Sequence, residues 1–246
     1  MVLQGKVAVV TGAAGVLGLA ATRSLLEDGA QVALVDIDVM RLDSLVRFLR
    51  GTTIASTCDV TDSSAVTATH QQVEKLLGPV DVLVSCAGVA SENRAEKTAD
   101  NEWRRVLAAN LDGAFYWSRA VLPAMKKRGW GRIIHVTSLA AKGGGPAGGI
   151  AYATSKGALT ALTFSLAREA ASQGVTVNAI APAFVMTPSV AEQLNEAQRR
   201  QILARIPAGR FCEPEEFAHA VRFLASPLAG FITGEVLDLN GGLHMD

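Results

Sequence analysis

The stretch Lys6-Val7-Ala8-Val9-Val10-Thr11-Gly12-Ala13-Ala14-Gly15-Val16-Leu17-Gly18 decides the fold of this chain. Residues 6–10 form an apolar run rich in valine, which is typical of a strand buried on both faces. A turn with three glycines follows, and residues 16–27 then have the pattern of a helix. Such a turn lets the backbone approach a pyrophosphate, which the helix N-terminus stabilises. In isolation, an ordinary glycine turn would be the favoured interpretation.

Short apolar runs alternate with longer amphipathic segments along the rest of the chain. We expect strands at 6–10, 31–35, 80–85, 132–136, 176–180 and 235–239, and another strand that ends near Cys58. We expect helices at 16–27, 39–49, 64–77, 101–125, 152–172, 192–205 and 215–225. Since no linker or internal repeat interrupts this β-α-β alternation, it predicts a single α/β domain over residues 1–246. The domain should be a Rossmann fold, a doubly wound parallel sheet with helices on both faces.

The composition excludes several classes of protein. Of the 246 residues 49% are apolar and 19% charged, which indicates a well-packed globule. The formal net charge is zero and the basic residues are spread thinly, which argues against a nucleic-acid partner. No apolar run approaches the ~20 residues of a membrane span, and we see no metal-ligand cluster. Three widely separated cysteines and the absence of a basic, apolar leader predict free thiols and a cytoplasmic protein.

Two carboxylates indicate which dinucleotide the glycine turn binds. Asp36 ends the second predicted strand, eighteen residues after Gly18, where an acid binds the ribose hydroxyls. A carboxylate there repels the 2′-phosphate of NADP(H), and no arginine directly follows it. NAD(H) is therefore the expected cofactor. Asp59, at another strand end, is placed to lie near the adenine.

A tyrosine and a lysine are spaced for acid–base chemistry. Tyr152 and Lys156 lie four residues apart, about one helical turn, so both side chains project from the same helix face. A nearby ammonium favours the phenolate and lowers the tyrosine pKa. Ser138, fourteen residues before Tyr152, follows an apolar run, and its hydroxyl could hold a substrate oxygen against the phenol. Chance supplies many such pairs.

Taken together with these features, several further motifs resemble the short-chain dehydrogenase/reductase family over essentially the whole chain. They are the glycine turn, Asp59-Val60, Ala87-Gly88, Asn110-Leu111-Asp112-Gly113, Ser138, Tyr152 with Lys156, Pro182 with Thr187, and Ile232-Thr233-Gly234.

The resemblance implies a role for each matching residue. Ser138 would position the substrate oxygen and Tyr152 would exchange its proton. Lys156 would lower the pKa of Tyr152 and bind the nicotinamide ribose, and Asn110 would anchor a water in a proton relay. The cofactor would contact Gly12, Gly15, Leu17, Gly18, Asp36, Asp59, Val60, Cys86, Ala87, Gly88, Tyr152, Lys156, Pro182, Val185 and Thr187.

The chain departs from the family pattern at three places. Val16 stands where the family usually has glycine, and its Cβ is expected to crowd or reshape the turn. Ser85-Cys86-Ala87-Gly88 replaces the usual Asn-Asn-Ala-Gly, so two amides that would brace the central strands are lost. Ala183 replaces the glycine that normally follows Pro182 and adds a methyl group near the nicotinamide.

Two loops bear on the substrate. Residues 142–149 contain five glycines, which fits a flexible connection or a substrate-facing loop equally well. Residues 184–210 begin at a strand end, where ligands of such sheets bind, and are expected to form a helical substrate lid, although a surface insertion would look the same.

The sequence is consistent with two classes of substrate. The C-terminal third most resembles the 3-oxoacyl-carrier-protein reductases of the superfamily, notably at residues 201–210 and 231–242. This favours reduction of a 3-oxoacyl thioester carried by acyl carrier protein or CoA. Those enzymes usually prefer NADPH, however, which Asp36 opposes. The alternative is a dehydrogenase of a sugar, polyol or other secondary alcohol, and a more remote one is a non-catalytic dinucleotide-binding protein.

The resemblance also suggests partners. Arg128 matches a basic position that docks the acidic carrier protein, but Gln173 stands where a second arginine would be expected. The family likeness further implies a homotetramer, in which the helices that begin near Asn101 and Tyr152 pack between subunits.

Overall fold

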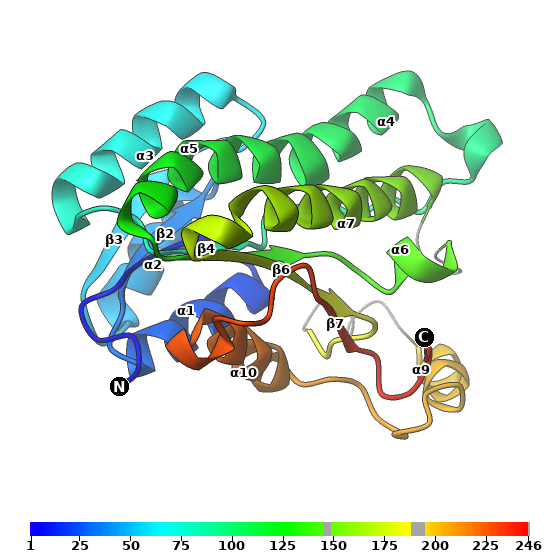
Figure 1. Ribbon diagram of the computed structural model, residues 1–246. Coiled ribbons are helices and arrows are strands. Elements are labelled where there is room, and N and C mark those ends of the chain that lie inside the picture. The colour runs from blue at the N-terminus through cyan, green and yellow to red at the C-terminus, as the bar shows by residue number, and fades with distance from the viewer. Residues whose placement is uncertain (145–148, 188–194, 246) are drawn as a thin grey trace.

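The computed structural model describes residues 1–144, 149–187 and 195–245 (Figure 1). Within them, seven strands form one parallel sheet in the order β3-β2-β1-β4-β5-β6-β7. The chain moves from β1 to one edge and then returns to β4, beside β1, before continuing to the other edge. The predicted doubly wound parallel sheet is therefore confirmed. The strands are β1 (Val7–Thr11), β2 (Gln31–Asp36), β3 (Thr53–Thr57), β4 (Val82–Ser85), β5 (Gly131–Val136), β6 (Val175–Pro182) and β7 (Val236–Leu239).

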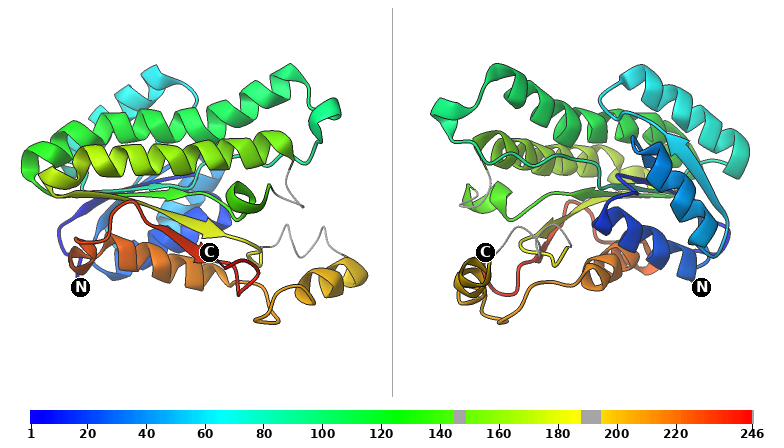
Figure 2. Two further views of the ribbon diagram at one scale, coloured as in Figure 1. Left: turned by 45° about the vertical axis from the view of Figure 1, so that its right-hand side comes forward. Right: turned by 180° about the vertical axis from the view of Figure 1, so that it is seen from behind.

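Helices cover both faces of the sheet, as Figure 2 shows from two sides. One face carries α1 (Val16–Glu27), α2 (Val39–Phe48) and α10 (Pro214–Ala225). The opposite face carries α3 (Ser63–Leu77), α4 (Asp100–Leu107), α5 (Gly113–Arg128) and α7 (Ile150–Ala170). Shorter helices are α6 (Ala140–Gly143), α9 (Glu196–Leu203), η1 (Ala95–Lys97), η3 (Ala171–Gln173) and η4 (Pro227–Ala229).

Alternation of side chains along the strands produces two separate cores. Val10 of β1 points to the α1–α10 side, where it belongs to the same cluster as Phe217. Its neighbour Val9 points to the other side, into the cluster that contains Trp117. Successive residues of a strand face opposite sides of the sheet. A strand in which successive residues are all apolar is therefore suited to burial on both faces. The five residues of β1 are all buried, as the valine-rich run predicted.

The structure corrects some predicted elements. The helix expected at 101–125 is α4, a π-helical segment η2 (Ala108–Asp112) and α5 in succession, so its hydrogen-bond pattern changes in the middle. Strand β3 received no predicted range because this edge strand is largely polar and only partly buried. Helix α6 falls partly in the expected loop 142–149, of which residues 145–148 lie outside the described residues.

Across the described ranges, none of the helices combines the length and apolarity needed to cross a membrane. No group of three or more His, Cys, Asp or Glu side chains in those ranges is arranged to share a metal ion. Cys58, Cys86 and Cys212 are free thiols.

Candidate active site

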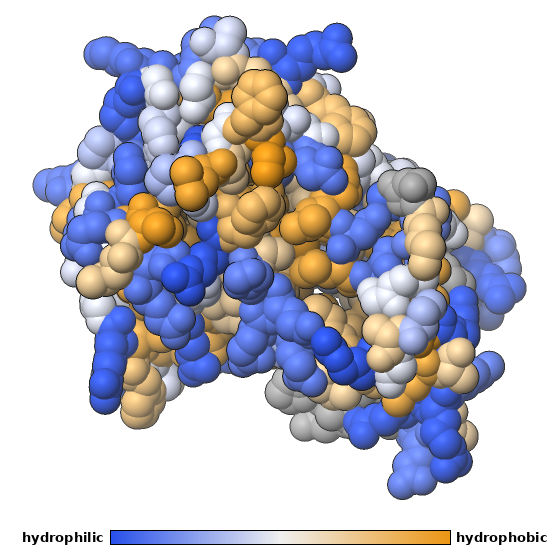
Figure 3. All heavy atoms as spheres, turned by 60° about the horizontal axis from the view of Figure 1, so that its bottom comes forward, coloured by the Kyte–Doolittle hydropathy of each residue, from blue (hydrophilic) through white to orange (hydrophobic). Residues whose placement is uncertain are grey.

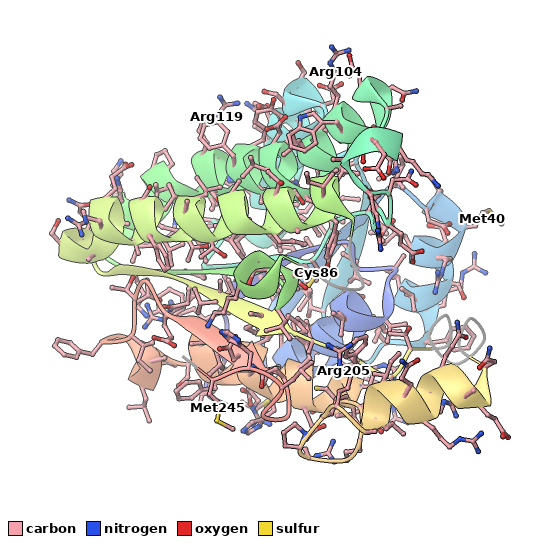
Figure 4. The ribbon with its side chains drawn as sticks, turned by 90° about the vertical axis from the view of Figure 1, so that its right-hand side faces the viewer. Met40, Cys86, Arg104, Arg119, Arg205 and Met245 are labelled. Atoms are coloured by element: carbon pink, nitrogen blue, oxygen red, sulfur yellow. The ribbon has the colours of Figure 1, made fainter. Side chains whose placement is uncertain are left out.

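A cleft opens where β1 and β4 end, at the point where the strand order reverses. Its cavity has a volume of about 580 Å³, which is in the usual range of ligand sites. Figure 4 looks onto this edge of the sheet, with Cys86 near the centre and Arg205, just after α9, below it. The lining includes many of the predicted cofactor residues: Gly12, Gly15, Asp36, Asp59, Val60, Cys86, Ala87 and Gly88.

The glycine turn has no room for side chains. Gly12 has φ of +64°, and a Cβ on it would lie 2.7 Å from the main-chain N of Ala87. A Cβ on Gly18 would lie 2.8 Å from Ala13 Cα and closer still to Gly12 O. Gly15 caps α1 without a side-chain hydrogen bond, so the first N–H groups of the helix are left for an anion. This cradle, which a Cβ would fill, fits the pyrophosphate of a dinucleotide.

Val16 and Leu17 do not face the cavity. Val16 is the first residue of α1, and its side chain lines a groove between α1 and α10 rather than the cleft. The side chain of Leu17 packs against the core, which leaves its main-chain N–H for the cofactor. Because Gly12 and Gly18 keep their close contacts, the turn forms with valine at position 16.

The carboxylate of Asp36 is fixed at the rim of the cleft. One oxygen accepts the N–H of Ala14 at 2.9 Å and the other accepts the N–H of Asp38 at 3.1 Å. Asp59 is held by Thr61, whose N–H and hydroxyl both donate to one carboxylate oxygen, at 2.9 and 2.8 Å. Both acids therefore have defined positions before any ligand binds.

Thr11 braces the segment that follows β4. Its carbonyl accepts the N–H of Cys86 at 3.2 Å and its hydroxyl accepts the N–H of Ala87 at 3.2 Å. Burial raises the pKa of the Cys86 thiol to about 12, so the thiol stays protonated in the cleft. The role of Thr11 was not predicted, although its place at the end of β1 was visible in the sequence.

Ser138, Tyr152 and Lys156 come together at the carboxyl end of β5. Ser138 lies two residues beyond this strand, and its hydroxyl lies close enough to the phenol of Tyr152 to influence the pKa of that phenol. Lys156 Nζ lies 5.8 Å from the centroid of the Tyr152 ring and donates to Val136 O at 2.6 Å. The predicted group is therefore assembled by β5 and α7.

Burial sets the protonation of this group. Burial raises the pKa of Tyr152, and the nearby Ser138 hydroxyl acts in the opposite direction. Burial also lowers the pKa of Lys156 to about 8, with the neighbouring Cys86 opposing it. The ammonium donates to Val136 O rather than to the phenol, so the expected lowering of the Tyr152 pKa by Lys156 stays a prediction.

Asn110 is 1% exposed and lies within the π-helical segment η2. Such segments are rare and often mark functional sites. Its Oδ1 accepts the N–H of Val89 at 2.7 Å, and its Nδ2 donates to Val89 O at 3.1 Å and to Ser155 Oγ at 2.9 Å. Both amide hydrogens are used, so the side chain has no further donor for a relay water, and the predicted relay role of Asn110 stays a prediction.

The segment after β6 carries three further predicted cofactor residues, Pro182, Val185 and Thr187, and none of them lines this cavity. Pro182 ends β6, and Val185 forms a parallel bridge with Cys212. Ala183 donates its N–H to Leu239 O at 3.0 Å. Thr187 is the last residue before 188–194, which lie outside the described residues along with the start of the expected helix 192–205. Within the expected lid 184–210, α9 begins with an Asn195–Gln198 capping box.

Glu102 was missed at the sequence level. Its carboxylate accepts hydrogen bonds from Ser91 and Asn93, beside the start of α7. No spacing in the sequence predicts this contact, because it joins a loop to the helix that follows it.

Comparison with known proteins assigns the chain to a family. A family model described as "Enoyl-(Acyl carrier protein) reductase" matches residues 12–244. The chain is 40% identical over 245 residues to the 3-oxoacyl-[acyl-carrier-protein] reductase FabG of Vibrio harveyi, with 100% of both chains covered. It is 38% identical over 246 residues to the protein of that name from Escherichia coli, with the same coverage, and to that from Thermotoga maritima, with 99% of both chains covered. The chain therefore belongs to the short-chain dehydrogenase/reductase family, oxidoreductases that use a nicotinamide dinucleotide and act on a CH–OH or keto group.

Proposed function

We propose that Tyr152 is the general acid and base of a ketone–alcohol interconversion, with Ser138 as its partner. The approach of the Ser138 hydroxyl to the Tyr152 phenol, next to the buried ammonium of Lys156, carries the proposal. A carbonyl oxygen placed against both hydroxyls would accept two hydrogen bonds, which stabilise the negative charge that develops on that oxygen.

Each residue then has a defined task during ketone reduction. The nicotinamide, when bound, supplies the hydride. Ser138 orients the carbonyl, and Tyr152 donates its phenolic proton to the oxygen. Lys156 stabilises the phenolate that remains, and a water on the main-chain carbonyl of Asn110 would return a proton through the lysine. In alcohol oxidation, Tyr152 accepts the proton instead.

NAD(H) is the proposed cofactor. The fixed carboxylate of Asp36 lies in the cleft next to the glycine turn, where it would accept hydrogen bonds from ribose hydroxyls and repel a 2′-phosphate. We expect Asp36→Ala to reduce the preference for NADH over NADPH at least tenfold, measured as the ratio of kcat/KM values. Unchanged selectivity would count against this role of Asp36.

The proposed substrate is a 3-oxoacyl thioester. The full-length identity to proteins named 3-oxoacyl-[acyl-carrier-protein] reductase supports it. The alternative, oxidation of a sugar, polyol or other secondary alcohol, uses the same catalytic group. A panel of ketoacyl thioesters, sugars and cyclic ketones separates the two, because only a thioester reductase would prefer the first class.

Carrier-protein docking through Arg128 receives little support. The Arg128 guanidinium donates to Val80 O at 2.5 Å and lies 3.5 Å from Asp81 Oδ1, so it is engaged within the chain. Gln173 contacts the neighbouring Ser172. Equal kcat/KM for acetoacetyl-CoA and the acetoacetyl carrier protein would show that the carrier adds no binding energy.

The homotetramer is also proposed from the family likeness. Exposed apolar side chains suit it: Phe115 on α5, and Ile150 and Phe164 on α7. Phe223 on α10 and Phe231 after η4 are also exposed. The face of the molecule in Figure 3 has apolar side chains among charged ones. Light scattering of the purified protein would give the state directly.

The central test is NADH consumption with acetoacetyl-CoA. We expect Tyr152→Phe to lower kcat about 10²–10⁴-fold, the usual contribution of a general acid. Tyr116→Phe is the matched control, since Tyr116 is the other tyrosine of the chain. Equal rates for wild type and Tyr152→Phe would contradict the catalytic assignment and leave a dinucleotide-binding role.

A further inference from the structure

A short segment that follows the cofactor cleft supports the helix that carries Tyr152. Residues 89–93, here named the bridging segment, come directly after Gly88, which lines the cavity. At one end of this segment, Asn110 binds both the N–H and the carbonyl of Val89. At the other end, its carbonyls contact α7.

These carbonyls cap α7. Ser91 O accepts the N–H of Gly149 at 2.6 Å, and Asn93 O accepts the N–H of Ile150 at 3.1 Å. Gly149, the N-cap of α7, has no side-chain cap, so the bridging segment satisfies N–H groups that the helix leaves unpaired. A Cβ on Gly149 would lie 2.6 Å from Asn93 N, which shows how closely the two segments approach.

Glu102 in the first turn of α4 holds the bridging segment from its other side. One carboxylate oxygen accepts from Ser91 Oγ at 2.6 Å and the other from Asn93 Nδ2 at 2.7 Å. The two residues that Glu102 binds are therefore the same two whose carbonyls cap α7. These hydrogen bonds lower the pKa of Glu102, which keeps the carboxylate ionised near neutral pH.

The contact continues to the catalytic tyrosine. Ile150 lies two residues before Tyr152, in the same first turn. Ser155 Oγ, which accepts from Asn110, donates to Tyr152 O at 2.7 Å. The start of α7 is thus attached to the bridging segment by two main-chain hydrogen bonds and to η2 by the Asn110 side chain.

We propose that Glu102 is a positioning residue for Tyr152, acting through Ser91 and Asn93 on the first turn of α7. The inference rests on the proposed function, because it assigns Glu102 to the same reaction. Removal of the carboxylate would release the bridging segment and let the phenol drift from the substrate oxygen. Displacements of about 1 Å in such a group lower rates by up to ~100-fold.

The test compares four variants in the NADH assay with acetoacetyl-CoA. We expect Glu102→Ala to lower kcat about 10- to 100-fold with little change in the KM for NADH. Glu102→Gln should stay near wild type, because its carbonyl can accept from Asn93 and its amide can donate to Ser91 Oγ. Asn93→Ala removes one of the two side-chain bonds and should give an intermediate loss. Asp100→Ala, which removes an exposed acid from the same turn, is the matched control and should act as wild type.

Hydrogen exchange gives a readout that needs no turnover. Peptides that cover the first turn of α7 should exchange faster in Glu102→Ala and Asn93→Ala, but not in Glu102→Gln or Asp100→Ala. Wild-type exchange and kcat in both Glu102→Ala and Asn93→Ala would overturn the proposal, as would a Glu102→Gln protein that folds yet is as impaired as Glu102→Ala. If Glu102→Ala does not fold, Asn93→Ala and Glu102→Gln decide alone. An inactive wild type, together with faster exchange in the variants, would refute the proposed function. It would still support the role of Glu102 in holding the bridging segment against α7.

Discussion

At the scale of single residues, Lys156 combines burial with a positive charge. Its side chain donates to Val136 O and is 5% exposed, so the ammonium has lost most of its hydration. The consequence is a pKa of about 8, which lies inside the range that an assay can cover.

The first prediction concerns the pH dependence of ketone reduction. The reaction proposed above needs a protonated Tyr152 and a charged Lys156. Burial raises the pKa of Tyr152 and lowers that of Lys156 to about 8. We therefore expect kcat/KM, which reports the free enzyme, to be constant at neutral pH and to fall as pH rises through about 8. Restored activity after return to neutral pH serves as the control for unfolding. A value of kcat/KM that stays constant up to pH ~10 would contradict this prediction.

The second prediction is that the buried charge of Lys156 lowers the free energy of unfolding of the protein. Because its folded pKa of about 8 lies below the ordinary lysine value, the unfolded chain binds more protons between these two pH values. Wild-type stability therefore rises with pH in that window. We expect Lys156→Met to be inactive yet about 1 kcal/mol more stable at pH 7, roughly 2–4 °C in Tm. The gain should shrink at pH 10. A less stable variant at pH 7 in urea unfolding would refute this.

At the scale of elements, the turn between β1 and α1 depends on which of its glycines is replaced. A Cβ on Gly18 would overlap the backbone of Gly12 and Ala13, whereas a Cβ on Gly15 meets only Gly12 O at 3.2 Å. We expect Gly18→Ala to destabilise the protein by about 1–3 kcal/mol and to weaken NADH binding at least tenfold. Gly15→Ala should have a smaller effect on stability. Equal unfolding midpoints for the two variants would show that the turn can adjust.

Much of the fold could be predicted because the apolar pattern of each segment agrees with its burial in the folded protein. The valine-rich β1 is buried on both faces, and α1 follows its glycine turn as expected. The π-helical segment η2 could not be predicted, since no residue of 108–112 marks it in the sequence, and the contacts of Asn110 with Val89 and Ser155 are visible only in the folded chain. The same holds for Glu102, whose partners Ser91 and Asn93 are defined only by the path of the loop before α4.

At the scale of the whole molecule, the sheet separates two cores that contain different aromatic anchors. Trp117 and Phe217 are both fully buried, on opposite faces. We expect Trp117→Phe and Phe217→Leu each to lower stability by about 1–2 kcal/mol. Their effects should add to within ~0.5 kcal/mol, because the two sites share no partners. A larger coupling energy in a double-mutant cycle of denaturant unfolding would show that the sheet transmits strain between its faces.

The pKa values of the three thiols determine how readily the protein reacts with oxidants. Burial raises the pKa of Cys58, of Cys86 to about 12 and of Cys212 to about 11, and the thiolate is the form that peroxides attack. A thiol with a low pKa in a ligand cleft would react with hydrogen peroxide or alkylating agents. Here the cleft thiol is kept in its unreactive form, so we expect activity to survive treatment with iodoacetamide at neutral pH. The cysteine that replaced an amide in this cleft therefore need not make the enzyme dependent on a reducing environment.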